Sequence, residues 1–201
     1  MTTTTVAKTE FYEGMPLSEE QFMRLAADAT NKYELVEGKL QIMPPSGQVH
    51  AKVVSRIDRK IGNWVEANEA GETYSEGAFR LAPQLIRAPD VGVVVTSRVP
   101  QDIDPKDTGP FPGAPDLAVE VLSAASSYGV IADRIEKYFQ FGTRLIWVVI
   151  PYHRRIEVHR ADGTVQRLGD DDVLSGEDVI PGFEIPVREL WPKSLGEPTE
   201  T

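Results

Sequence analysis

The ten residues 114–123, with the sequence APDLAVEVLS, constrain the fold more than any other stretch of this chain. Their aliphatic and β-branched side chains, together with the proline near the start, predict a buried strand. Side chains alternate between the two faces of a strand, so Asp116 and Glu120 share a face with Ala118 and Leu122. Burying a carboxylate is costly unless a cation, a proton or a hydrogen-bond donor compensates it. We therefore interpret this strand as one wall of a metal site.

The length of the chain, 201 residues, is enough for one domain with a full core, and no internal repeat is present. We expect a single domain at residues 15–192, with flexible tails at 1–14 and 193–201. The threonine-rich start lacks the apolar segment of a signal peptide. No apolar run reaches the roughly 18 residues of a membrane span. We therefore expect a cytoplasmic protein that does not contact a membrane.

Composition excludes several kinds of chemistry. The chain has no cysteine, which rules out disulfides, zinc–thiolate sites and a thiol nucleophile. Its formal charge of −10 argues against indiscriminate binding to phosphate, because nucleic-acid-binding proteins usually carry a basic surplus. A phosphate substrate would therefore need local basic groups or divalent ions.

Three segments have helical signals. Ser18 and Gln21 have the spacing of a capping box, which predicts a short first helix. From His50, apolar residues recur every three or four positions and predict a long helix that stops before Gly71. A third helix is expected from about residue 131 to Gly142. A basic stripe on the long helix is either a solvated face or a contact with a phosphate backbone, and it consists of Lys52, Arg56, Arg59 and Lys60.

Strand signals surround these helices. A Glu-Gly turn at positions 37 and 38 predicts a hairpin near the N-terminus. Residues 98–113 hold several Pro, Gly and Asp without a period, which predicts a long loop. The other expected strands lie within 72–81, 88–96, 145–150, 155–160 and 164–168. This order predicts an α/β (α+β) fold, in which helices flank a mixed central sheet behind an N-terminal hairpin and helix.

Several of these segments together resemble a known family. From about Tyr33 to Arg160 the chain is similar to the Uma-two family of restriction endonuclease-like proteins, within the PD-(D/E)xK nuclease superfamily. The resemblance implies a restriction endonuclease-like core, with Asp90 and Glu120 as metal ligands. Each motif is weak alone, but their order is specific. The matching residues are Tyr33 to Gly38, His50, Pro89 to Val91, Pro115 to Ser123, Tyr138, Gly142 and Trp147.

The resemblance also shows where the chain departs from the family. Superfamily enzymes usually have a lysine two residues after the acid, where this chain has Leu122. The family pattern moves the basic residue to the following helix, at Arg134, where lysine is usual, and Val130 replaces an acid. Arginine can clamp a phosphate but cannot lose a proton to act as a base. Lys137, three residues further on, could substitute.

The implied chemistry uses a divalent cation, Mg²⁺ or Mn²⁺. Mg²⁺ needs only a few protein oxygens because it keeps several waters, so an Asp and a Glu on neighbouring strands suffice. The ion polarises a phosphoryl oxygen and lowers the pKa of a bound water. A nearby cation stabilises the developing negative charge. We therefore expect Asp90, Glu120, Arg134 and Lys137 to act on DNA, in a symmetric dimer if the enzyme cuts duplexes.

Other candidate residues have both structural and functional interpretations. Glu34 either orients a metal-bound water or lies on a solvated hairpin face. His50 either approaches the site or caps its helix. Asp116 follows a proline at a strand start, where an aspartate commonly serves the turn, and we expect a structural role. Tyr138 and Trp147 are expected to fill the core.

Three functions fit these observations. The first is a Mg²⁺-dependent endonuclease acting on DNA. The second is a nuclease-fold protein that has lost catalysis and serves as a nucleic-acid-binding or protein-assembly module, with salt-sensitive binding through Lys52, Arg56 and Arg59. The third is a protein-interaction partner that uses the acidic surface.

Overall fold

The computed structural model describes residues 11–27, 32–43, 45–123 and 128–196. Residues 1–10 and 197–201 of the predicted tails lie outside this described part, as do residues 124–127. Hydrogen bonds reach positions flanking the predicted domain, since Gly14 N donates to Leu40 O and Lys52 Nζ donates to Ser194 Oγ. The described α-helices are α1 (Glu19–Ala27), α2 (Gln48–Ala67) and α3 (Tyr128–Gln140). None of them combines the length and apolar character needed to span a bilayer.

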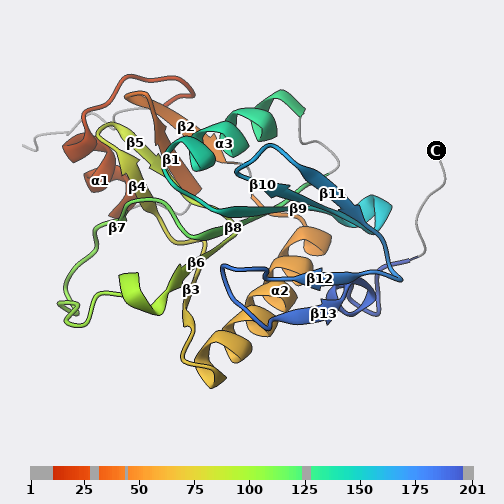
Figure 1. The fold of residues 1–201 in the computed structure, drawn as a ribbon. Coiled ribbons are helices and arrows are strands. Elements are labelled where there is room, and N and C mark those ends of the chain that lie inside the picture. The colour runs from red at the N-terminus through yellow and green to blue at the C-terminus, as the bar shows by residue number, and fades with distance from the viewer. Residues whose placement is uncertain (1–10, 28–31, 44, 124–127, 197–201) are drawn as a thin grey trace, which may run out of the picture.

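A six-stranded mixed sheet forms the centre of the molecule, in the order β11-β10-β9-β8-β6-β3 (Figure 1). Strand β8 is the predicted central strand, and it pairs in parallel with β9 and antiparallel with β6. Helix α3 connects the two parallel strands. The six strands are β3 (Gly71–Ser75), β6 (Val91–Val95), β8 (Leu117–Val121), β9 (Leu145–Ile150), β10 (Arg155–Arg160) and β11 (Val165–Leu168).

A second sheet of five strands, in the order β2-β1-β5-β4-β7, carries the N-terminal hairpin. Its strands are β1 (Lys32–Val36), β2 (Lys39–Met43), β4 (Phe79–Ala82), β5 (Leu85–Arg87) and β7 (Phe111–Pro112). A separate pair joins β12 (Val173–Ser175) to β13 (Glu184–Pro186). Short 3₁₀ turns are η1 (Thr96–Arg98), η2 (Pro151–His153) and η3 (Val187–Leu190).

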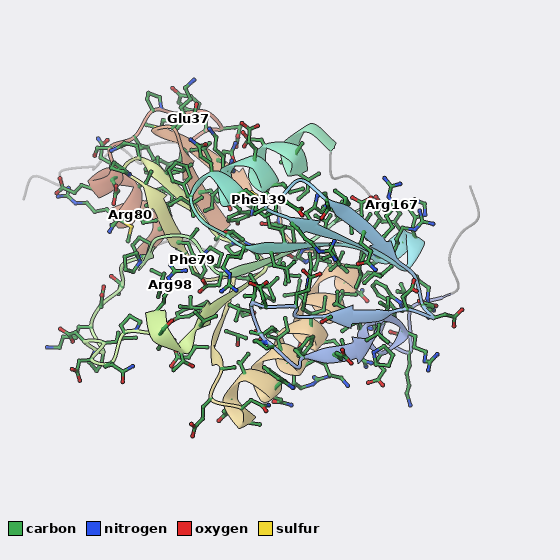
Figure 2. The ribbon with its side chains drawn as sticks, viewed as in Figure 1. Glu37, Phe79, Arg80, Arg98, Phe139 and Arg167 are labelled. Carbon is green, nitrogen blue, oxygen red and sulfur yellow. The ribbon has the colours of Figure 1, made fainter. Side chains whose placement is uncertain are left out.

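Two hydrophobic layers cover the six-stranded sheet, with α2 on one face and α3 on the other (Figure 1). Leu117, Val119 and Val121 pack on the α2 side, whereas Ala118 packs on the α3 side. The predicted alternation along β8 is therefore confirmed, and it places Glu120 under α3. Figure 2 shows how side chains fill the layers, with Phe79 inside and Arg167 at the edge.

Local sequence signals are confirmed where the chain makes its own contacts. Ser18 N donates to Gln21 Oε1 at 2.8 Å, and Gln21 N donates to Ser18 Oγ at 3.2 Å, which is the reciprocal capping box. The hairpin turn has positive φ at both Glu37 (50°) and Gly38 (75°). A two-residue turn with both central residues in this region matches the twist of the strands it joins.

Two features of the fold were not predicted. The strands on either side of Glu76 and Gly77 belong to different sheets, because β3 pairs with β6 while β4 pairs with β5 and β7. Strand β5, strand β7 inside the predicted loop at residues 98–113, and the β12–β13 pair were also missed. Each of these strands is only two or three residues long, too short to show a period.

Candidate functional site

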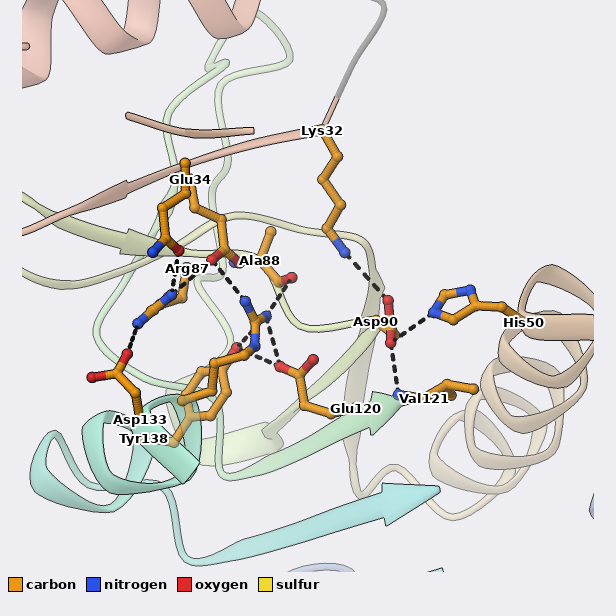
Figure 3. Close-up of polar contacts among 12 residues, drawn as sticks. Lys32, Glu34, His50, Arg87, Ala88, Asp90, Glu120, Val121, Asp133 and Tyr138 are labelled. Atoms are coloured by element: carbon orange, nitrogen blue, oxygen red, sulfur yellow. Dashed lines mark hydrogen bonds and ion pairs between the residues drawn. The ribbon is translucent and has the colours of Figure 1, made fainter. Parts of the chain in front are cut away.

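Asp90 and Glu120 come from neighbouring strands of the six-stranded sheet. Asp90 immediately precedes β6, and its backbone N–H donates to Val119 O at 3.1 Å. Its Oδ2 atom accepts the N–H of Val121, the last residue of β8, at 2.7 Å. Glu120 lies one position before Val121, so the two carboxylates meet near the C-terminal end of β8 (Figure 3).

The Glu120 carboxylate is held on one side only. Its Oε1 atom accepts hydrogen bonds from Arg134 Nη2 at 2.7 Å and from Tyr138 OH at 3.0 Å. Residues 134 and 138 are about one helical turn apart on α3 and face the sheet together. The Oε2 atom, on the Asp90 side in Figure 3, has no hydrogen-bond partner among the described residues. Glu120 is 6% exposed, so this oxygen belongs to a largely buried carboxylate.

Asp90 is flanked by two basic side chains from different elements. Lys32 Nζ, from the first residue of β1, donates to Asp90 Oδ1 at 3.3 Å. His50 Nε2, from the first turn of α2, lies 3.2 Å from Asp90 Oδ2. Burial acts to raise the pKa of Asp90, but the hydrogen bond with His50 and the Lys32 charge outweigh it and lower that pKa. In the reverse direction, the hydrogen bond to Asp90 raises the pKa of His50.

Glu34 is the centre of a buried ion network beside this pair. The side chain is fully buried, and its Oε2 accepts from Arg87 Nη1 at 3.0 Å and from Arg134 Nη1 at 2.7 Å. Its Oε1 accepts the backbone N–H of Ala88 at 2.8 Å. Arg87 also pairs with Asp133 of α3. The network therefore ties the hairpin to the helix that covers the larger sheet (Figure 3).

The two glutamates that share Arg134 have opposite pKa shifts. Burial acts to raise the pKa of Glu34, but two arginines and the Ala88 N–H reverse this and lower it. Burial raises the pKa of Glu120, and the Asp90 charge adds to the rise, so the single close cation Arg134 does not offset both. Burial together with the Glu120 charge also raises the pKa of Tyr138 well above 10, so Tyr138 remains a hydrogen-bond donor. Glu120 is thus the acid of this cluster whose charge is not fully compensated, because Arg134 and Lys32 act against both burial and the Asp90 charge.

Comparison with known proteins shows which family this chain belongs to. The family model Uma2, described as "Putative restriction endonuclease", matches residues 19–188. The chain belongs to the Uma2 family. A solved structure, described as that of "a putative nuclease belonging to DUF820" from Anabaena variabilis ATCC 29413, has a similar fold with a TM-score of 0.76. It is 21% identical, and the match covers 87% of this chain and 97% of that one. No curated protein matches the chain.

This Uma2 protein places Arg134 and Lys137, the two predicted helix cations, in different surroundings. Arg134 contacts Glu120, but it is 3% exposed and its donors already meet Glu34, Glu120 and Ala88 O. Lys137 ion-pairs with Glu37 of the hairpin turn at 3.2 Å and contacts neither acid of the pair. The structure thus places Lys137 at the hairpin turn, and its substitution for the family's basic residue stays a prediction. Position 137 is rotated about 100° from position 138, which faces the sheet.

The structure also shows the surroundings of the other predicted residues. The solvated alternative for Glu34 is wrong, because the side chain is buried among cations. His50 reaches the site through Asp90. Asp116 lies at the opposite end of β8, where its Oδ2 accepts from Val95 N and pairs with Arg98, each at 3.0 Å. Trp147 is fully buried in the α2-side core.

The basic stripe of α2 contacts the end of the described chain. Lys52 Nζ donates to Ser194 Oγ at 3.2 Å, and Arg56 Nη1 donates to Glu189 O at 3.2 Å. Lys60 pairs with the Glu189 carboxylate at 2.8 Å. The stripe is partly exposed, but three of its four residues are engaged by residues 189–194. These contacts favour a structural role for the stripe.

Sequence reasoning missed three members of the cluster, namely Lys32, Arg87 and Asp133. Arg87 had a signal, since it is a lone cation at the end of the apolar pair Leu85 and Ile86. A buried cation needs a buried acid, and Glu34 and Glu120 are two acids within predicted apolar strands that could supply it. Lys32 and Asp133 had no such signal. Lys32 is the first residue of a strand and Asp133 lies on a helix, and charged residues at such positions usually face solvent.

The donor set fits a divalent cation with only two protein carboxylates. Across the described ranges, no three His, Cys, Asp or Glu side chains are grouped to enclose a metal ion. Asp90 and Glu120 still offer carboxylate oxygens, and the Oε2 atom of Glu120 has no hydrogen-bond partner among the described residues. Mg²⁺ suits such a site because water and phosphate oxygens complete its six ligands.

Proposed function

We propose that this protein is a metal-dependent endonuclease that hydrolyses DNA phosphodiester bonds, with Asp90 and Glu120 as the Mg²⁺ or Mn²⁺ ligands. The observation that supports it best is the Glu120 carboxylate. One of its oxygens is fixed by Arg134 and Tyr138, while the other has no partner among the described residues and lies toward Asp90. Membership of the Uma2 family, described as "Putative restriction endonuclease", supports the same class of reaction.

The protein's own residues would prepare the site before substrate arrives. Arg134 and Tyr138 fix the orientation of Glu120, and Val121 N and His50 fix that of Asp90. Side chains locked in this way do not need to reorganise during the reaction, which is how a fixed polar site lowers a barrier. When bound, the divalent ion would polarise a phosphoryl oxygen and lower the pKa of its water.

In this proposal Arg134 helps to fix the orientation of Glu120 and does not contact the substrate phosphate. Its guanidinium is 3% exposed and shared between two glutamates. Arginine in such a forked arrangement holds carboxylates in defined positions. In this proposal Arg134 therefore acts through Glu120, as a positioning residue.

The test is cleavage of supercoiled plasmid and of single-stranded DNA in Mg²⁺ or Mn²⁺, with EDTA as the blank. We expect wild type to cleave, and Glu120→Gln and Asp90→Asn to lose cleavage. The matched control is Glu37→Gln, which neutralises an exposed glutamate of the hairpin turn and should cleave like wild type. Cleavage of equal rate in Glu120→Gln would rule out the assignment.

A second function, a nuclease-fold binding module without turnover, is favoured by a different observation. Leu122 occupies the position of the usual superfamily lysine, and Arg134 is enclosed by Glu34 and Glu120. Such a module would bind DNA in a salt-sensitive way and leave it intact in either metal. Binding to DNA in EDTA, measured beside the cleavage assay, separates the two functions.

A further inference from the structure

We infer that Lys32 is the side chain that binds the substrate's phosphate at this site. The inference rests on the proposed function, which brings a phosphodiester to Asp90 and Glu120. A phosphodiester carries a negative charge, and two carboxylates repel it unless a cation stands beside them. Neither the superfamily position at Leu122 nor the helix position at Arg134 supplies an accessible cation.

The two arginines of the cluster are already committed to protein acceptors. Arg87 is 1% exposed and donates to Glu34, Gln41 and Asp133. Arg134 is 3% exposed and donates to Glu34, Glu120 and Ala88 O. The one guanidinium nitrogen left over in each, Nε, is itself buried without a partner. A phosphate outside the cluster has no route to either guanidinium.

Lys32 is different in both exposure and bonding. Its side chain is 22% exposed, and among the described residues its ammonium contacts a single acceptor, Asp90 Oδ1, at a long 3.3 Å. An ammonium carries three donors, so two remain for another acceptor. Figure 3 shows the Lys32 ammonium at Asp90, and its charge also acts to lower the pKa of Glu120.

His50 does not replace Lys32 in this role. Its Nε2 atom is taken by Asp90, and its Nδ1 atom is buried without a partner. Neither ring nitrogen is free to meet a phosphate from solvent. Lys32 is therefore the cation contacting Asp90 that has spare donors and a path to solvent, and lysine is a regular phosphate-binding point charge.

The experiment measures binding of a fluorescent duplex oligonucleotide to the full chain in EDTA, over a series of salt concentrations. We expect Lys32→Met to weaken binding at low salt and to reduce the slope of log affinity against log salt by about 1. Lys32→Arg keeps the charge and should retain the wild-type slope. Lys39→Met removes an exposed lysine from β2 of the same hairpin and is the matched control.

Three results would overturn the inference. The first is a wild-type slope in Lys32→Met, which would mean that Lys32 only neutralises Asp90. The second is a wild-type protein with no affinity for the oligonucleotide at low salt. The third is cleavage of equal kcat/KM in wild type and Lys32→Met, which would spare the proposed function and reject Lys32. Failure of the proposed function has a separate signature, namely a Lys32-dependent slope in a protein that cleaves no DNA in Mg²⁺ or Mn²⁺.

Discussion

Two acidic centres lie side by side in this molecule, and they are built differently. Around Glu34, two buried arginines and a backbone N–H satisfy both carboxylate oxygens. Around Asp90 and Glu120, the cations are one shared arginine, a partly exposed lysine and a histidine. The first centre is closed, and the second keeps one carboxylate oxygen free and one ammonium within reach of solvent.

The contrast separates residues that hold the fold together from residues that can meet a ligand. Burial penalises the charge of Glu34 and of Glu120, yet the pKa of Glu34 is lowered and that of Glu120 is raised. The sign follows the surroundings: Glu34 has two contacting arginines and the Ala88 N–H, whereas Glu120 has one contacting arginine and the nearby negative charge of Asp90. Removing one partner of a compensated buried pair is expensive, whereas removing an undercompensated charge is not. The following predictions test this difference.

The largest effect is expected for Glu34→Gln. It leaves Arg87 and Arg134 buried with too few acids, and breaking a buried ion pair in this way costs about 3–5 kcal/mol. Urea unfolding of the variant measures the loss in the free energy of unfolding. Glu37→Gln, three residues away and exposed, should stay within about 0.5 kcal/mol of wild type. Equal, small losses in both variants would show that the Glu34 ion network does not stabilise the fold more than an exposed glutamate does.

The difference in the free energy of unfolding between wild type and Glu34→Gln should vary with pH. The pKa of Glu34 is lowered from 4.5, so its contribution to stability is fully present above pH 4.5 and is lost as pH falls through the folded-state pKa. The gap in unfolding free energy between wild type and Glu34→Gln should therefore be constant above that pH and shrink below it. Unfolding curves at a series of acidic pH values measure the gap. A gap that widened on acidification would contradict the direction given for Glu34.

Tyr138→Phe tests the hydrogen bond that, with Arg134, fixes the Glu120 carboxylate. The Tyr138 hydroxyl donates to Glu120 Oε1 at 3.0 Å inside the core, and a hydrogen bond to a charged group contributes about 1.5–3 kcal/mol. We expect a loss of that size in thermal or urea unfolding. Tyr152→Phe removes a hydroxyl from a tyrosine that is 38% exposed, and it should change stability much less. Equal losses of stability in the two variants would show that the Tyr138 hydroxyl does not stabilise the buried network.

The smallest effect on stability is expected for Glu120→Gln. Because the pKa of Glu120 is raised, its ionised form is disfavoured in the folded protein, and a neutral amide removes that penalty. Arg134 keeps Glu34 as its partner in this variant. Stability should stay within about 1 kcal/mol of wild type while DNA cleavage is lost. A loss as large as that of Glu34→Gln would erase the distinction between the centres.

Much of the fold could be predicted because its signals are local. The alternation along 114–123 assigned Glu120 to its face, the Ser18–Gln21 box started α1, and the Glu37–Gly38 turn closed the hairpin. The partners of the acids could not be predicted in the same way. Lys32 lies 58 residues before Asp90, and Arg134 lies 100 residues after Glu34.

The sequence by itself determined that buried strands would carry acids, that helices would flank a mixed sheet, and that the chain resembles a nuclease family. Only the tertiary structure decided how each acid is compensated, which cations are enclosed, and that Lys137 faces the hairpin turn instead of the acid pair. The physical reason is the distance along the chain over which each interaction acts. Backbone periodicity acts over a few residues, whereas the free energy of a buried charge depends on every charge and donor within several ångströms, whatever their distance along the chain.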